Sequence, residues 1–188
     1  MRLEPIDRAP TLFGKFLSLV YKLALGKTIM PVRVVYNRVP RMYNVGWALL
    51  NLDLRGFTLS HELRYLIHTR ISTINGCQFC KDIVLAGAVR EKLGREKFDA
   101  IMGDGWRQSP LFSDRERAAI AFAEETTVNK KVSDATFEEV RKHFNDREIV
   151  EIAVENAKSN MYNMINVALD IEDDGLLAIA EARAKRKG

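Results

Sequence analysis

Apolar side chains recur every three or four residues along almost the whole 188-residue chain, and no segment shows the alternation and hairpin signals of paired strands. This periodicity predicts an all-α fold, with helix starts marked by Ser60, Ser113, Ser133 and Asp146. The expected helices span residues 11–26, 42–52, 60–74, 77–93, 113–125, 133–144, 147–169 and about 176–186.

The chain length and a hydrophobic content of 47% suit one domain with a sizeable core. An N-terminal helical arm is expected over about 1–41, where Pro31 and Pro40 interrupt the helical pattern, followed by a core over about 42–172. The first helix of the arm carries one apolar stripe, and the loop at 103–110 is the best candidate for an internal boundary. The stripe consists of Leu12, Phe16, Val20 and Leu23.

The net charge of +4 is mild, and the basic residues are scattered apart from the run 183–187, which we expect to be a solvated helix end. The apolar stretch 16–25 is broken by Lys22 and is far shorter than the roughly 20 residues of a membrane span. The sequence shows no secretory signal. We therefore expect a soluble cytoplasmic protein that binds neither nucleic acid nor membranes.

Cys77 and Cys80, the only two cysteines, lie where one helical pattern stops at Asn75-Gly76 and the next begins. At the first turn of a helix, unpaired amide N–H groups and the macrodipole stabilise a thiolate, which can lower a thiol pKa from about 8.5 towards 7 or below. The spacing therefore favours a redox-active dithiol, in which one thiolate attacks and its neighbour closes a disulfide.

Two other readings of the pair stay open. A structural zinc site would need His61, His68 or His143 as further ligands, and none follows the cysteines at the usual short spacing. The cysteines could also be small buried residues without chemistry. No metal or cofactor is expected, because the redox reading needs neither.

Three segments of this chain resemble segments of one known family and follow one another in the same order as in that family. The run 70–80, with Asn75-Gly76-Cys77 and Cys80, is similar to the signature of the alkylhydroperoxidase D-like branch of the carboxymuconolactone decarboxylase superfamily. The segment 109–119, followed by 132–134 and Phe144, resembles the region after the cysteine helix. The stretch from Ile152 resembles the Asn-rich last core helix. Its asparagines are Asn160, Asn163 and Asn166.

The resemblance covers roughly 42–172 and implies an alkylhydroperoxidase D-like helical bundle that assembles into homo-oligomers. It also implies a thiol-dependent antioxidant protein, a peroxidase or disulfide reductase, in which Cys80 attacks a hydroperoxide and forms a sulfenic acid. Cys77 would then resolve this acid as a disulfide. A dithiol partner, either a lipoyl or a thioredoxin-like protein, would restore the thiols.

The chain departs from the family pattern at the proton relay. Competent members carry a His four residues after the second cysteine and a Glu about twelve residues before the first, where this chain has Val84 and Tyr65. Tyr65, Glu62 and His68 are the candidates to support the cysteines instead, although Glu62 and His68 lack the three- or four-residue spacing of a helical pair.

The asparagines are expected to form a structural network that bonds the cysteine turn or an oligomer neighbour, and Asn163 is a further possible supporting residue. Without the relay, a catalytically degenerate member that serves as a redox sensor or interaction module is the main alternative function. A decarboxylase-type lyase is a weaker one, since those members generally lack the cysteine pair.

Overall fold

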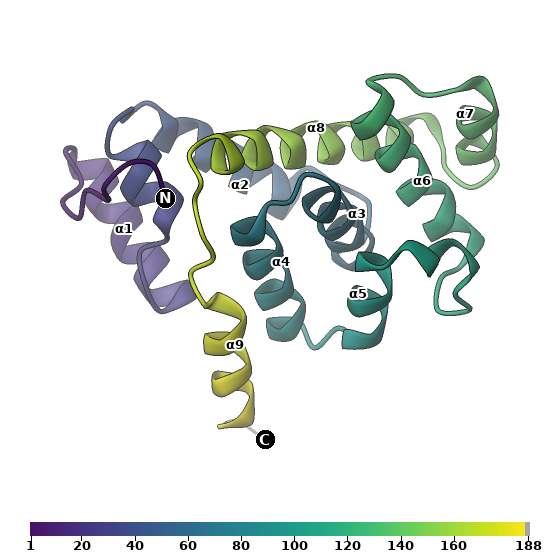
Figure 1. Ribbon diagram of the computed structural model, residues 1–188. Coiled ribbons are helices and arrows are strands. Elements are labelled where there is room, and N and C mark those ends of the chain that lie inside the picture. Colours follow the sequence, from purple (N-terminus) through teal and green to yellow (C-terminus); the bar gives the residue numbers. More distant parts are fainter. Residues whose placement is uncertain (187–188) are drawn as a thin grey trace.

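The computed structural model describes residues 1–186, and within this range the regular elements are all helical (Figure 1). The prediction of an all-α fold is therefore confirmed. The α-helices are α1 (Leu12–Leu25), α2 (Met42–Arg55), α3 (His61–Ile74), α4 (Gln78–Arg90), α5 (Arg95–Met102), α6 (Asp114–Asn129), α7 (Asp134–Arg141), α8 (Asp146–Ala168) and α9 (Leu176–Lys185). A π-helical turn, η1 (Val32–Tyr36), and a 3-10 turn, η2 (Asp104–Gln108), complete them.

Helix α3 lies at the centre of the main core, packed against α4, α5, α6 and α8. Its apolar residues Leu63, Leu66, Ile67 and Ile71 are all buried, as their helical spacing predicted. The long helix α8 runs across the molecule from α6 and α7 at one end to the N-terminal arm at the other (Figure 1). Helices α3, α4 and α8 together therefore form the frame that positions the cysteines.

The N-terminal arm and α9 enclose the cysteine helix on its other side. A second core cluster combines Cys77 and Cys80 with Val32 and Tyr36 of η1 and Leu176 of α9. Helix α9 packs along α4, so both ends of the chain contribute to the environment of the cysteine pair.

Two buried aspartates attach these outer elements to the cysteine helix. Asp82 of α4 accepts backbone N–H bonds from Leu176 and Leu177 at 2.8 Å each, and from Asp174 at 3.1 Å, so its side chain caps α9. The carboxylate of Asp174 in turn accepts the N–H of Met30 and pairs with Lys27 at 2.8 Å. The arm, the start of α9 and the cysteine helix are thus linked by one chain of polar contacts.

The helix starts predicted at Ser60, Ser113 and Ser133 are confirmed as N-caps, whereas the start predicted at Asp146 is wrong by one residue. The cap of α8 is Asn145, whose side chain accepts the N–H of Glu148 while the Glu148 carboxylate accepts the N–H of Asn145. This reciprocal pair is a capping box, which fixes the cap at the residue three before the glutamate.

The segment after α4 differs most from the expectation. The cysteine helix ends at Arg90 rather than at residue 93, and α5 follows where no helix was predicted. The proposed boundary loop holds the buried Trp106 in η2, and Arg70 of α3 donates hydrogen bonds of 3.3 Å to the carbonyls of Ile101 and Gly103. Tertiary contacts therefore order a segment whose local sequence signals were weak.

The apolar stripe of α1 faces outward, since Leu12 and Leu23 are 84% and 73% exposed while Gly14 and Leu17 are buried. Of the basic run 183–187, residue Lys187 lies outside the described residues. In the described range, no helix combines the length and the apolar character needed to cross a bilayer.

Candidate functional site

The two cysteines lie in a tight turn between α3 and α4. Gly76 has a φ of +70°, a conformation that favours glycine, and it brings the chain round so that Cys77 becomes the N-cap of α4. The Cys77 sulfur accepts the backbone N–H of Cys80 at 3.3 Å, and the two cysteines are joined in a disulfide. Both residues are only 1% exposed, so the pair is reached only from within the fold.

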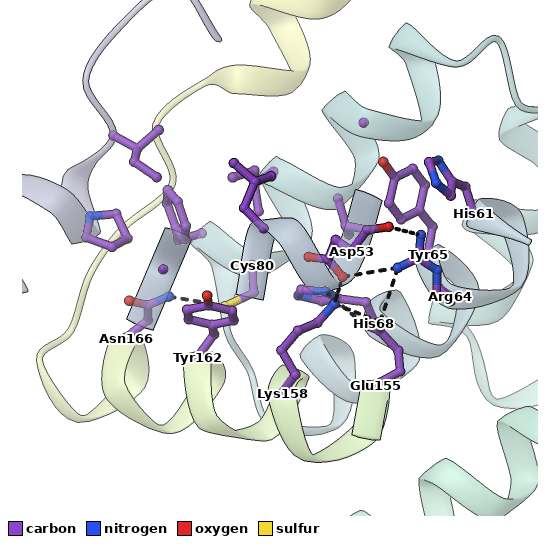
Figure 2. A pocket seen from close by; sticks show the side chains of 18 of the residues that line it. Asp53, His61, Arg64, Tyr65, His68, Cys80, Glu155, Lys158, Tyr162 and Asn166 are labelled. Atoms are coloured by element: carbon purple, nitrogen blue, oxygen red, sulfur yellow. Dashed lines mark hydrogen bonds and ion pairs between the residues drawn. The ribbon is translucent and has the colours of Figure 1, made fainter. Parts of the chain in front are cut away.

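A cavity of about 350 Å³ gives this access, and Cys80 is part of its wall whereas Cys77 is not (Figure 2). Side chains of the arm, α2, α3, α4 and α8 line it, with Ile29, Phe79 and Ile83 among its apolar residues. Ligand sites are typically concave, mostly apolar and of about 300–1,000 Å³. The geometry therefore makes Cys80, rather than Cys77, the sulfur that a bound molecule would meet first.

The Asn-rich face of α8 holds the cysteine turn. Asn166 donates a hydrogen bond to the Cys80 sulfur at 3.3 Å, and Asn163 donates to the Ser72 hydroxyl at 3.3 Å. Asn75, just before the cysteines, donates to the side-chain oxygens of Asn160 at 2.9 Å and Asn163 at 3.2 Å. The predicted asparagine network is thus present, and its direct contact with the sulfur is made by Asn166, which the sequence did not single out from the series.

Tyr65 lines the cavity, but its hydroxyl is turned away from the sulfur. It donates to the Glu91 carboxylate at 2.8 Å, beside His61, whose Nδ1 lies 2.9 Å from the same group. The ring packs against Gly87 of α4, where an added Cβ would come within 3.2 Å of it. Burial first, and then the hydrogen bond to Glu91, raise the pKa of Tyr65 above its ordinary value, so this phenol is no base for a thiol.

Glu62 does not reach the cavity. Its carboxylate pairs with Lys97 of α5 at 3.1 Å on the other side of α3. Glu62 is therefore not placed to support the cysteines, although the sequence made it a candidate for that role. Its partner Lys97 lies on α5, a helix that the sequence did not predict.

A compact cluster of acidic and basic side chains forms another part of the cavity wall (Figure 2). Lys158 of α8 pairs with Glu155 at 2.7 Å and also with Asp53 of α2. Arg64 of α3 pairs with Asp53 at 3.1 Å. The only sequence signal was the three-residue spacing of Glu155 and Lys158 along one helix.

His68 of α3 lies against this cluster. Its Nδ1 is 4.0 Å from a Glu155 oxygen, and its Nε2 is covered and has no hydrogen-bond partner among residues 1–186. Burial, and secondarily the Lys158 charge, lower the pKa of His68 to about 3, so the imidazole is neutral near pH 7. Burial raises the pKa of Glu155, against the opposing effect of Lys158.

Three further titratable groups on the wall are tyrosines of the arm and α8. Burial raises the pKa of Tyr162 to about 12, although a hydrogen bond with Tyr36 opposes this rise, and the pKa of Tyr36 and Tyr21 is raised as well. These phenols are therefore neutral and give the cavity an aromatic, uncharged side next to Cys80. Among residues 1–186, no group of three or more His, Cys, Asp and Glu side chains is arranged to hold a metal ion.

A known family and several known proteins are similar to this chain. Residues 40–125 match the Carboxymuconolactone decarboxylase family. The uncharacterized protein YnjA of Escherichia coli strain K12 is 30% identical over 190 residues, which cover 98% of this chain and 100% of that protein.

Two solved structures share the fold over most of this chain. A protein of unknown function from Agrobacterium tumefaciens, described as a putative antioxidant defence protein AhpD, is 30% identical with a TM-score of 0.68 over 75% of this chain and 97% of its own. The debrominase Bmp8, solved with 2,3,4-tribromopyrrole, has a TM-score of 0.80 over 98% of this chain and 97% of its own, at 19% identity. The second likeness concerns the fold alone.

Proposed function

Because the chain belongs to the carboxymuconolactone decarboxylase family, we propose that it is a thiol-dependent antioxidant enzyme that reduces hydroperoxides through Cys77 and Cys80. The observation that carries the proposal is the position of Cys80, which is bonded to Cys77 and also lies on the wall of a cavity large enough for an organic substrate. A dithiol without such a cavity would have no place to bind a peroxide.

One catalytic cycle starts from the reduced pair of cysteines. The Cys80 thiolate attacks the terminal oxygen of a hydroperoxide, the O–O bond breaks, and the alcohol leaves after taking up one proton. The Cys77 thiol then attacks the resulting sulfenic acid, which forms the disulfide and releases water. An external dithiol returns two electrons and two protons by thiol–disulfide exchange.

Burial of the disulfide favours one class of electron donor. Both cysteines are 1% exposed and only Cys80 borders the cavity, so the reductant has to enter the cavity to reach a sulfur. A slender dithiol, such as a lipoyl arm, fits this route, whereas a thioredoxin-like protein attacks with a cysteine close to its own surface. We therefore propose a lipoyl-type donor rather than a thioredoxin-like one.

The test is consumption of cumene hydroperoxide by the native protein, by Cys80→Ser and by Cys77→Ser, with dihydrolipoamide or reduced thioredoxin as donor. We expect steady turnover with dihydrolipoamide in the native protein and none in Cys80→Ser. In Cys77→Ser without any dithiol we expect a single turnover that leaves a sulfenic acid trapped by dimedone. His143→Gln, away from the cavity, is the matched control and should turn over like the native protein.

An inactive native protein whose disulfide still forms with peroxide would overturn the enzyme proposal and favour a redox sensor. Equal turnover with thioredoxin would contradict the proposed donor while leaving the peroxidase itself intact. The two parts of the proposal are thus tested separately.

A further inference from the structure

The facing surfaces of α3 and α4 place His68 at the level of Val84. The two helices are joined by the cysteine turn and pack side by side, and the Tyr65 ring lies on Gly87. One helical turn nearer the cysteines, His68 follows Tyr65 on α3 and Val84 precedes Gly87 on α4. An imidazole therefore projects from α3 at the level of Val84, one helical turn beyond Cys80 on α4.

His68 has one ring nitrogen directed at a carboxylate and one without a partner. The Nδ1 atom lies 4.0 Å from a Glu155 oxygen, so the carboxyl group is placed to orient the ring from that side. The Nε2 atom is buried, and among the described residues nothing bonds it. Buried polar atoms without a partner are uncommon and point to a state in which the partner is supplied.

The acidic and basic side chains of the cluster are already paired with one another in the disulfide form. Asp53 pairs with both Lys158 and Arg64, and Glu155 pairs with Lys158. A thiolate formed at Cys80 would add one negative charge that none of these four groups neutralises. A buried thiolate needs an opposite charge or strong donors, and a neutral imidazole on the same cavity wall can supply the charge by taking up a proton.

We propose that His68 takes up a proton when the disulfide is reduced and thereby holds Cys80 as a thiolate, with Glu155 as the positioning residue for its ring. The inference rests on the proposed function in one respect, since it requires the Cys77–Cys80 bond to open and close. Reduction by a dithiol then yields the Cys77 thiol, the Cys80 thiolate, protonated His68 and the oxidised donor. The two electrons of the donor reduce the disulfide, and its two protons are taken up by the Cys77 sulfur and by His68.

This pair would replace the relay that Val84 and Tyr65 lack. Figure 2 shows the His68 ring between Cys80 and Glu155 in that view. The low pKa of His68 belongs to the disulfide form, in which no negative sulfur is present. The charged and titratable groups that share the cavity wall with His68 are Glu155, Lys158 and Tyr162 of α8, Asp53 of α2, His61, Arg64 and Tyr65 of α3, Cys80, Arg90 and Glu91 at the cysteine helix and its end, and Tyr21 and Tyr36 of the arm.

The direct test is a pH titration of the histidine ring nitrogens by ¹⁵N NMR in the oxidised protein and in the protein reduced with dithiothreitol. The His68 signals are assigned from their loss in His68→Gln, and His143 serves as the internal control. We expect His68 to stay neutral above about pH 4.5 in the oxidised form, which follows from a pKa of about 3. We expect it to be protonated at pH 7 in the reduced form, while the His143 signals at that pH are the same in both forms.

A His68 ring that stays neutral at pH 7 in the reduced protein would overturn the inference. This measurement needs no peroxide turnover, so it stands or falls separately from the proposed enzyme activity.

Alkylation provides the second measurement. In the Cys77→Ser background, His68→Gln should slow the reaction of Cys80 with iodoacetamide at pH 7 by about tenfold, the effect of one pH unit in the thiolate fraction. Glu155→Gln should slow it less, because it acts only through the ring, and His143→Gln should not change it. Equal rates in all variants that retain the native circular dichroism spectrum would contradict the proposal.

Discussion

Asn166 is the residue whose side chain touches the reactive sulfur in the structure, at 3.3 Å. A hydrogen bond to a charged group is worth about 1.5–3 kcal/mol, so its loss should lower the thiolate fraction by at least about tenfold near neutral pH. In the Cys77→Ser background we expect Asn166→Leu to shift the pH profile of Cys80 alkylation upward by about one unit. Asn166→Asp should shift it further, because it removes the donor and adds a like charge.

The matched control for Asn166 is Asn163→Ser on the same helix, since Asn163 donates to Ser72 and not to the sulfur. Its profile should stay within about 0.3 unit of the parent, a small fraction of the shift from one charged hydrogen bond. Equal shifts in both variants would mean that the asparagine network acts on Cys80 only by holding the turn.

Single residues differ in how far the sequence could reveal them. Cys77 and Cys80 were identifiable because their chemistry is tied to a short local spacing at a helix start. Asp53 was not identifiable, because its partners Arg64 and Lys158 lie on two other helices and Lys158 is 105 residues away. A cluster assembled across α2, α3 and α8 leaves no local pattern, so only the tertiary structure discloses it.

At the scale of helices, Asp82 fastens α9 to the cysteine helix by accepting three backbone N–H bonds. Asp82→Asn keeps the shape but removes one acceptor and the charge at the α9 start, so we expect the free energy of unfolding to fall by about 2 kcal/mol. Urea denaturation measures the loss, and faster amide exchange confined to α9 and the arm would show where the structure loosens.

Asp173→Asn is the control for Asp82, because Asp173 is exposed and, within the part of the chain that the structure describes, its carboxylate accepts only the N–H of Gly175 in the same turn. Its free energy of unfolding should change by less than about 0.5 kcal/mol, as for most surface substitutions. A comparable loss in both variants would argue against a specific role of Asp82.

Helix boundaries could be predicted from the sequence where a side chain caps the helix. Ser60, Ser113 and Ser133 each accept a backbone N–H three residues on, and each start was expected from sequence. Helix α5 was missed because it is short and its cap, Gly94, makes no side-chain bond. Its order comes from burial of Phe98 and Ile101 in the main core, which local propensity does not encode.

At the scale of the whole molecule, α1 turns an apolar surface outward. Three residues of its predicted stripe, Leu12, Phe16 and Leu23, are more than half exposed, and Leu19 beside them is as well. Contiguous apolar surface of this kind marks interaction sites, and the homo-oligomer implied by the family resemblance is the occupant that we propose. We expect light scattering to give a multiple of the 21.4 kDa protomer mass for the native protein and a smaller mass for Phe16→Lys/Leu23→Lys. Lys22→Gln, on another side of α1, should leave the mass unchanged, whereas a native protein that is monomeric at tens of micromolar would refute this assignment.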